Sequence, residues 1–157
     1  MARESKVDPS MAPDEVVLRH ATPSDAPAIH ALMRPYVSQR LLLARSEAEI
    51  IELTRHGFVA MLAPRCIGFA AVEIYSPKLA ELQCLAVRDD ARRSGIGKRL
   101  VEACLDRARD LGVMEVLAIS SSDDFLRSCG FDYSLPDQKR ALFYQLQPRD
   151  HGLPPDA

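Results

Sequence analysis

The sequence has no apolar run that approaches the ~20 residues needed to cross a bilayer. Residues 1–6 lack the apolar centre that a signal peptide requires. The formal net charge at pH 7 is only -2, and no stripe of lysine and arginine with interleaved aromatic residues compensates for it. These absences predict a cytoplasmic protein that binds neither membranes nor nucleic acid.

The four cysteines and four histidines also lack the spacing of a metal site. No Cys-x-x-Cys pair occurs, and no two histidines stand at positions i and i+4. We therefore expect no metal ion. We expect reduced cysteines that pack in the core, with Cys84 as a separate case.

The residues that are present fit one small globular domain. Of the 157 residues, 47% are apolar and 27% are charged, which is enough apolar material for one core and too much for a disordered chain. Both ends are polar and contain prolines, so we expect flexible segments at 1–13 and 148–157. A single domain over 14–147 remains.

Hydrophobic periodicity and capping residues predict an alternation of strands and helices. Strands are expected at 16–18, 58–62, 67–74, 79–87, 113–119 and 141–146. Helices are expected after Thr22, at 46–53, at 98–111 and at 123–129. Because short turns join the strands at 58–87, the order predicts an antiparallel meander inside an α/β (α+β) chain.

A glycine loop joins the strand at 79–87 to the helix at 98–111. Its residues Arg92-Arg93-Ser94-Gly95-Ile96-Gly97 precede Lys98. Backbone N–H groups at a helix start attract anions, and glycine lets a phosphate approach the main chain. A triphosphate P-loop would need Ser or Thr where Arg99 stands, and a dinucleotide loop would need glycine at Leu100. A different phosphate loop remains, with an ordinary glycine turn as the alternative.

The pattern Arg-x-x-Gly-x-Gly resembles the pyrophosphate loop of the GNAT N-acetyltransferase superfamily. The element order resembles that fold from Val16 to Leu146, with residues 125–131 in the place of its second cofactor motif. The resemblance implies a mixed, mostly antiparallel sheet flanked by helices, with acetyl-coenzyme A in a cleft where the fourth and fifth strands splay apart. The residues implied in cofactor binding are Leu85, Ala86, Val87, Arg92, Arg93, Ser94, Gly95, Ile96, Gly97 and Lys98.

Within the superfamily the chain resembles the acetyltransferase domain of N-acetylglutamate synthases, which serve arginine biosynthesis. The likeness rests on Arg19-His20-Ala21 with Asp25, on residues 42–46 and 81–87, and on Leu135-Pro136 before Lys139-Arg140. It implies that Arg45 binds a carboxylate of glutamate and that Glu81 is a general base. Lys139 is a candidate for a second carboxylate, with a plain charged turn as the alternative. The chain would be a free-standing domain without an amino-acid-kinase partner.

The expected chemistry explains these residue types. An α-amine is protonated at neutral pH and cannot attack a thioester until a carboxylate such as Glu81 removes a proton. The thioester oxygen gains negative charge during attack and needs a fixed donor. Backbone N–H groups of Leu85 and Val87 would supply it where the fourth strand bulges away from the fifth.

The sequence also departs from the superfamily. Leu126 stands where many members place a tyrosine acid. A hydroxyl of Ser120, Ser121 or Ser122 could donate instead, with Ser121 as the candidate, or the coenzyme A thiolate could leave without an acid. Cys84 could act as a nucleophile, but no histidine base accompanies it, so we expect direct transfer and a thiol that lines the site. The residues after the last strand also differ from the glutamate-specific pattern.

The prediction is therefore an acetyl-coenzyme A dependent N-acetyltransferase that acts on a small-molecule amine, the α-amine of an acidic amino acid. Two alternatives stay open. One is the same chemistry on another amine, such as a polyamine or a protein amine. The other is a non-catalytic acyl-coenzyme A binding module. The oligomeric state is open between a monomer and a homodimer.

Overall fold

The computed structural model describes residues 15–133 and 142–148, except residues 93 and 121. Five strands form one sheet in the order β1-β2-β3-β4-β5. Their bounds are Val17–His20, Gly57–Leu62, Arg65–Ile74, Leu79–Val87 and Glu115–Ala118. The first four pair antiparallel, and β5 pairs parallel with β4, which gives the mixed sheet that the sequence predicts. Of the predicted tail segments, residues 1–13 and all of 148–157 except residue 148 lie outside the described residues.

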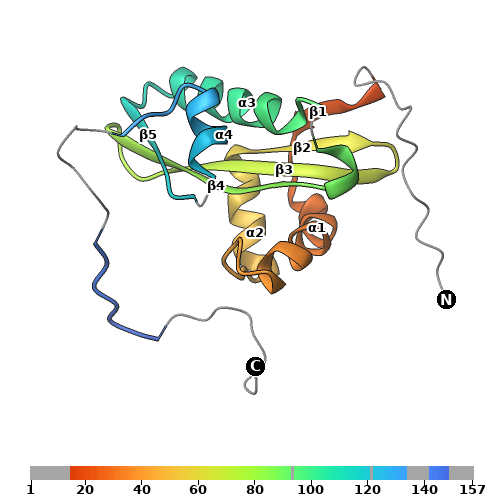
Figure 1. The fold of residues 1–157 in the computed structure, drawn as a ribbon, viewed down its shortest axis with the longest axis horizontal. Helices are drawn as coiled ribbons and strands as arrows, with labels where there is room; N and C mark the ends of the chain where they lie inside the picture. Colours follow the sequence, from red (N-terminus) through yellow and green to blue (C-terminus); the bar gives the residue numbers. More distant parts are fainter. Residues whose placement is uncertain (1–14, 93, 121, 134–141, 149–157) are drawn as a thin grey trace.

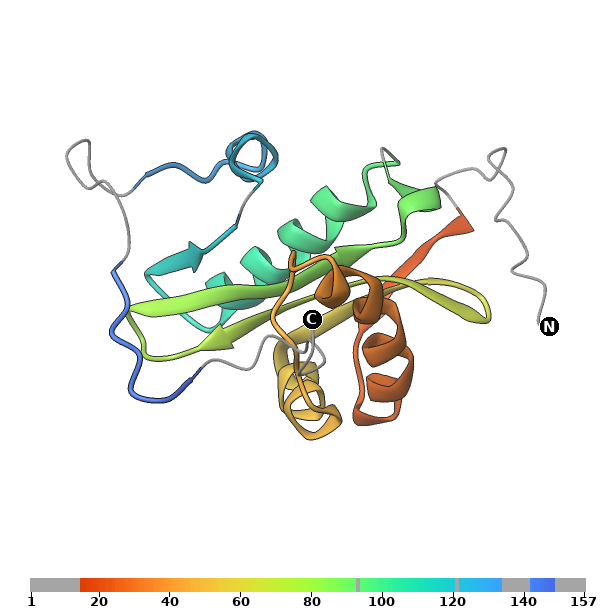
Figure 2. The same cartoon turned by 60° about the horizontal axis from the view of Figure 1, so that its bottom comes forward.

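Among the described residues, four α-helices cover the two faces of this sheet. Helices α1 (Ala26–Ser38) and α2 (Glu47–Leu53) lie on one face, and α3 (Ile96–Asp110) and α4 (Asp123–Ser128) lie on the other (Figures 1 and 2). Because side chains alternate along β3, Ala70 and Val72 pack toward α3 while Phe69 and Ala71 pack toward α1. The sheet therefore separates two cores. No helix in the described ranges is both long enough and apolar enough to span a membrane.

Local sequence signals set several of the element boundaries. Ser46 caps α2 through a capping box in which its hydroxyl accepts the Glu49 N–H at 3.1 Å and its own N–H donates to the Glu49 carboxylate at 2.8 Å. This cap holds the residue before it, Arg45, at the helix entrance. Gly57 begins β2, after a turn of 3-10 helix at Thr54–His56 that follows α2.

The prediction of a last strand at 141–146 is wrong for the residues that the structure describes. Leu142 to Leu146 form no strand, and Leu142, Tyr144 and Leu146 are 87–94% exposed. The alternating pattern of these residues supplies β propensity, but propensity reflects packing on a pleated surface and does not make a strand by itself. Residue 141 and the segment 134–140 lie outside the described residues.

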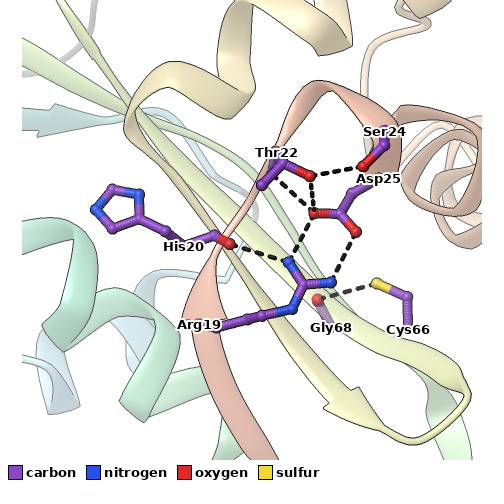
Figure 3. Close-up of polar contacts among 7 residues, drawn as sticks. All are labelled: Arg19, His20, Thr22, Ser24, Asp25, Cys66 and Gly68. Carbon is purple, nitrogen blue, oxygen red and sulfur yellow. Dashed lines mark hydrogen bonds and ion pairs between the residues drawn. The ribbon is translucent and has the colours of Figure 1, made fainter.

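A bidentate ion pair joins the end of β1 to the start of α1 (Figure 3). The Arg19 guanidinium donates to both oxygens of Asp25 at 2.8 Å, and Asp25 also accepts the Thr22 N–H at 2.8 Å. The hydrogen bond from Arg19, followed by that from the Thr22 N–H, lowers the pKa of Asp25 to about 2. This ion pair fixes the 3-10 turn Pro23–Asp25, which leads into α1.

The first prediction concerns this ion pair. Asp25→Asn should lower the free energy of unfolding at pH 7 by about 1–2 kcal/mol, because it removes a charge-assisted pair. The effect is no larger because the arginine of the pair is exposed to solvent. The pKa of Asp25 is lower in the folded state than in the unfolded state, where it is about 4. Ionised Asp25 therefore stabilises the fold above pH 4, and this contribution is lost as the pH falls toward 2. Urea unfolding of both proteins between pH 7 and pH 3 measures the difference. A gap that widens as pH falls would contradict the assignment.

Candidate active site

A cavity opens where β4 and β5 stop pairing. The parallel ladder runs from Leu79 opposite Glu115 to Leu82 opposite Ala118 and then ends. Beyond this point lies a cavity of about 570 Å³. Its lining comes from α1, the segment after α1, the end of β4, the start of α3 and the segment that leads into α4: Tyr36, Leu41, Leu42, Leu82, Cys84, Leu85, Ala86, Val87, Ala91, Arg92, Gly95, Gly97, Lys98, Ala118, Ile119, Ser120, Ser122, Phe125 and Leu126.

A β-bulge bends β4 at the edge of this cavity. Phe69 of β3 pairs with Ala86, whereas Ala71 pairs with Gln83, so Cys84 and Leu85 together face the single residue between them on β3. Cys84 takes a left-handed backbone conformation with φ 58°. An extra residue of this kind bends its strand and re-aims the backbone that follows.

The backbone of Val87 faces the gap rather than β3. The Arg88 N–H donates to the carbonyl of Ile67 at 2.8 Å. In an antiparallel ladder the residue one step earlier turns both its N–H and its C=O to the opposite side, which at Val87 is the side of the cavity. The Val87 carbonyl accepts a hydrogen bond from the Tyr36 hydroxyl at 2.5 Å. Its N–H is thus directed toward the space in which the sequence analysis expects a thioester oxygen.

The start of α3 has the features of a pyrophosphate site. Gly95 is the N-cap residue in a left-handed conformation with φ 80°, and no side chain of the described residues caps this end. A Cβ at Gly95 would meet no atom within 4 Å, and both Gly95 and Gly97 line the cavity. The first N–H groups of α3 therefore lack helical acceptors and face an open cavity, as a phosphate group requires.

Gly97 has a second role. A Cβ at this position would lie 3.3 Å from the Phe125 ring and 3.7 Å from the Val87 side chain. Gly97 thus lets the first turn of α3 pack closely between β4 and α4, in addition to leaving room for a ligand. The residues around the loop fit the pyrophosphate of a coenzyme A.

Positive charge and an aromatic ring flank this loop. The Arg92 guanidinium lies over the Tyr36 ring at 5.3 Å from its centroid and pairs with Asp89 at 3.2 Å. Lys98 lies on the first turn of α3 and lines the cavity. Tyr36 was not expected from the sequence, because no local pattern shows that a residue of α1 reaches β4.

The predicted cofactor residues fall into three groups. Leu85, Ala86, Val87, Arg92, Gly95, Gly97 and Lys98 line the cavity. Ser94 and Ile96 do not: the Ser94 hydroxyl donates to the Ala91 carbonyl, and Ile96 packs in the core at 2% exposure. Arg93 lies outside the described residues.

A polar network lies beside the cavity, on the same face of the sheet as α1 and α2. The amide of Gln83, which is 8% exposed, is its centre. The Gln83 oxygen accepts from the Arg45 guanidinium at 2.8 Å, and its nitrogen donates to the carboxylate of Glu73. The Tyr75 hydroxyl lies 3.1 Å from the same nitrogen and donates to Glu81. The network thus brings Arg45 and Glu81, two predicted site residues, together.

Three members of this network were not expected from the sequence: Glu73, Tyr75 and Gln83. A signal was present, since Glu73 and Tyr75 on one side of a short turn, and Glu81 and Gln83 on the other, alternate with apolar residues. In the pairing of β3 with β4, Glu73 stands directly opposite Glu81. That register becomes known only once the hairpin is seen.

The remaining candidates differ in what the structure says of them. Glu81 is half-buried and lies next to Leu82, which lines the cavity, but Glu81 itself does not line it. Burial raises the pKa of Cys84 to about 11, against the smaller lowering effect of the Arg45 guanidinium, so this thiol stays protonated at neutral pH. Ser120 and Ser122 line the cavity. Ser121, Lys139 and Arg140 lie outside the described residues.

No group of His, Cys, Asp and Glu side chains among the described residues could hold a metal ion. The geometry consists of a splayed strand pair, a bulged β4 and a glycine-rich helix start. Residues 25–131 match the model of the acetyltransferase (GNAT) family. The chain belongs to this family. It is therefore an acyltransferase, and acetyl-coenzyme A is its cosubstrate.

Individual relatives agree with this assignment. The chain is 35% identical over 117 residues to an uncharacterized N-acetyltransferase of Chlorobaculum tepidum. This alignment covers 74% of this chain and 76% of the relative. It is 35% identical over 149 residues to the amino-acid acetyltransferase of Pasteurella multocida, which covers 87% of this chain. It spans 32% of the length of that longer relative.

The solved structures that resemble the chain include the N-acetylglutamate synthase of Neisseria gonorrhoeae in complex with coenzyme A and N-acetyl-glutamate. The TM-score is 0.67 at 30% identity, over 72% of this chain and 27% of that one. The match confirms the GNAT fold that the sequence predicts: a mixed sheet with helices on both faces.

The second prediction tests the basic side of the loop. Lys98→Ala should weaken coenzyme A binding about three- to tenfold, since one cationic donor next to the helix start is lost while the backbone site remains. Arg99→Ala is the matched control, because Arg99 is the next residue on α3 and does not line the cavity. Isothermal calorimetry measures both affinities. Equal losses in the two variants would show a general charge effect instead of a local contact.

Proposed function

We propose that this enzyme transfers the acetyl group of acetyl-coenzyme A to the α-amine of a small acidic amino acid, with glutamate as the first candidate. Transfer is direct, with Glu81 as general base. One observation carries the proposal: an arginine next to the cavity has a buried donor without an acceptor. The amino-acid acetyltransferase of Pasteurella multocida and the N-acetyl-glutamate complex of the Neisseria enzyme support it.

Arg45 is this arginine. One arm of its guanidinium donates to Gln83 at 2.8 Å. Its Nε is buried and has no hydrogen-bond partner among the described residues. A buried donor without an acceptor is costly, and a guanidinium presents two parallel donors that match a carboxylate. A substrate carboxylate would supply the acceptor that Arg45 lacks.

The contacts of Glu81 support its proposed role as general base. It shares the network of Gln83 with Arg45, so an amino acid held at Arg45 would present its amine near Glu81. Glu81 is separated from the cavity by a single residue step, and a base can act directly or through one water molecule. The raised pKa of Cys84 speaks against a first transfer to that thiol.

The gap side of β4 would stabilise the developing oxyanion. The Val87 N–H is directed there, and Leu85 is part of the bulge. Backbone donors held by a sheet need no reorganisation when charge develops on the thioester oxygen. Ser120 and Ser122 line the same cavity and are the described hydroxyls that could protonate the departing thiolate.

The proposed activity also implies a pathway, a compartment and the extent of the catalytic domain. A glutamate acetyltransferase of this type would serve amino-acid biosynthesis, namely the arginine route, in the cytoplasm. Lys139 would hold a second carboxylate, and Ser121 would compete with its two neighbours as acid. We propose residues 14–147 as the catalytic domain, either as a monomer or as a homodimer.

One observation favours a second candidate acceptor. Glu73 and Glu81 stand opposite each other on neighbouring strands, and two adjacent carboxylates attract a cationic amine. A polyamine or a lysine side chain would use both. The two candidates can be separated by testing a panel of acidic amino acids and polyamines as acceptors. The release of free coenzyme A thiol measures the turnover of each one. A chain that turns over no amine at all would instead be a binding module.

The third prediction concerns the base. Glu81→Gln should lower kcat by about 100-fold or more, because the amide cannot accept the proton of the acceptor's ammonium group, while coenzyme A affinity stays unchanged. Glu102→Gln, on the exposed side of α3, is the control and should keep full activity. Steady-state assays at saturating acetyl-coenzyme A measure the effect. Wild-type turnover by Glu81→Gln would assign the base to another residue or to solvent.

The fourth prediction concerns the acceptor. Arg45→Ala should lower kcat/KM for glutamate or aspartate. The loss should correspond to about 2–4 kcal/mol of transition-state stabilisation, since two charge-assisted hydrogen bonds are lost. Arg45→Lys should restore little, because a lysine cannot form the paired contact. Arg55→Ala, which removes an exposed arginine beyond α2, is the control.

The acceptor panel decides between the two candidates. If Arg45→Ala keeps its activity on acidic amino acids, or if the wild type prefers polyamines, the acidic-acceptor proposal fails and the family-level activity stands. A cationic acceptor should react no more slowly after Arg45→Ala, since the arginine repels it.

A further inference from the structure

Tyr75 lies in contact with the proposed general base, and none of the functional assignments above uses it. It follows directly on β3 and is 51% exposed. Its hydroxyl donates to Oε2 of Glu81 and lies 3.1 Å from the Gln83 amide nitrogen, from which it accepts. A tyrosine hydroxyl can give and receive one hydrogen bond each in this way. Tyr75 is thus held by one neighbour while it holds another.

The orientation of the Gln83 amide is fixed by its neighbours. Arg45 can only donate, so the amide oxygen faces it, and the amide nitrogen must then face Glu73, Tyr75 and Glu81. This nitrogen lies closest to Glu73 and is 3.4 Å from Glu81. Glu73 therefore takes its donor from Gln83, and Glu81 takes its donor from Tyr75.

The cross-strand position of the two glutamates makes this division important. Like charges directly opposite each other on paired strands repel. Without a separate donor, the Glu81 side chain would be free to rotate away from Glu73 and from the acceptor. Partial burial and, to a smaller extent, the hydrogen bond to Glu81 raise the pKa of Tyr75. The hydroxyl therefore keeps its proton over the whole pH range in which the enzyme would be assayed.

We propose that Tyr75 is a positioning residue for Glu81: its hydroxyl holds one carboxylate oxygen, so that the other oxygen faces the acceptor amine. The inference rests on the proposed role of Glu81 as base. The proton of the ammonium group passes to the free oxygen, Oε1, and the nitrogen keeps the electron pair with which it attacks. Tyr75 keeps its own proton throughout.

The structure provides a matched control for this tyrosine. Tyr133 is 62% exposed, and its hydroxyl donates to the Asp123 carboxylate at 2.7 Å, away from the cavity. Tyr75→Phe and Tyr133→Phe therefore remove the same group from the same kind of contact. Both positions are exposed enough to accept a phenylalanine, and thermal melting of the full chain verifies that both variants fold.

We expect Tyr75→Phe to lower kcat/KM for the acceptor about tenfold, the scale of a lost hydrogen bond to a charged group, without a change in coenzyme A affinity. Tyr133→Phe should leave the rate unchanged.

A double variant separates the two assignments. If Tyr75 acts through Glu81, adding Tyr75→Phe to Glu81→Gln should lower the rate no further. A multiplied loss would overturn the positioning role while the base stays in place. If Glu81→Gln alone retains full activity, the base assignment itself fails.

Discussion

The end of the β4–β5 ladder is the constraint on which the site depends. Parallel pairing stops at Leu82 and Ala118, and beyond that point the backbone groups on the β5 side of β4 need partners from elsewhere, while the opposite side stays paired with β3. The bulge at Cys84 and Leu85 turns the strand, the Tyr36 hydroxyl takes the Val87 carbonyl, and the remaining groups face the cavity. A continuous sheet would have filled this space with a fifth strand. The gap is what allows an extended ligand to lie between two strands.

The polar network beside the cavity is organised by a buried amide. Gln83 is both a donor and an acceptor, so it can stand between an arginine and a carboxylate without either charge being left unpaired. An apolar residue there would leave Arg45 and Glu73 without these partners inside a region of low polarity, where unpaired groups are costly. This explains why a glutamine occupies a position on β4 that is otherwise part of an apolar run.

How much the sequence could predict depends on the range of the interactions. The capping box at Ser46 and the glycine-rich start of α3 are local, and both occur where the sequence places them. The hairpin partners Glu73 and Glu81 depend on register, which a one-residue slip would change. The contact between Tyr36 and Val87 joins residues 51 positions apart, so no periodicity could indicate it. The prediction of a strand at 141–146 was wrong for a related reason. The β propensity of a segment does not show whether another strand is available to pair with it.

The Tyr36 hydroxyl has one more consequence. Tyr36 belongs to the buried face of α1, together with Ile29, Leu32 and Met33, and through its single oxygen it is attached to the end of β4. The position of the Val87 backbone is thereby tied to how α1 sits on the sheet. A change in helix packing at Met33, remote from any substrate, would be transmitted through the ring of Tyr36 as a displacement of β4 at the mouth of the cleft. The shape of the cavity therefore depends on the packing of Ile29, Leu32 and Met33, although these three residues do not line it.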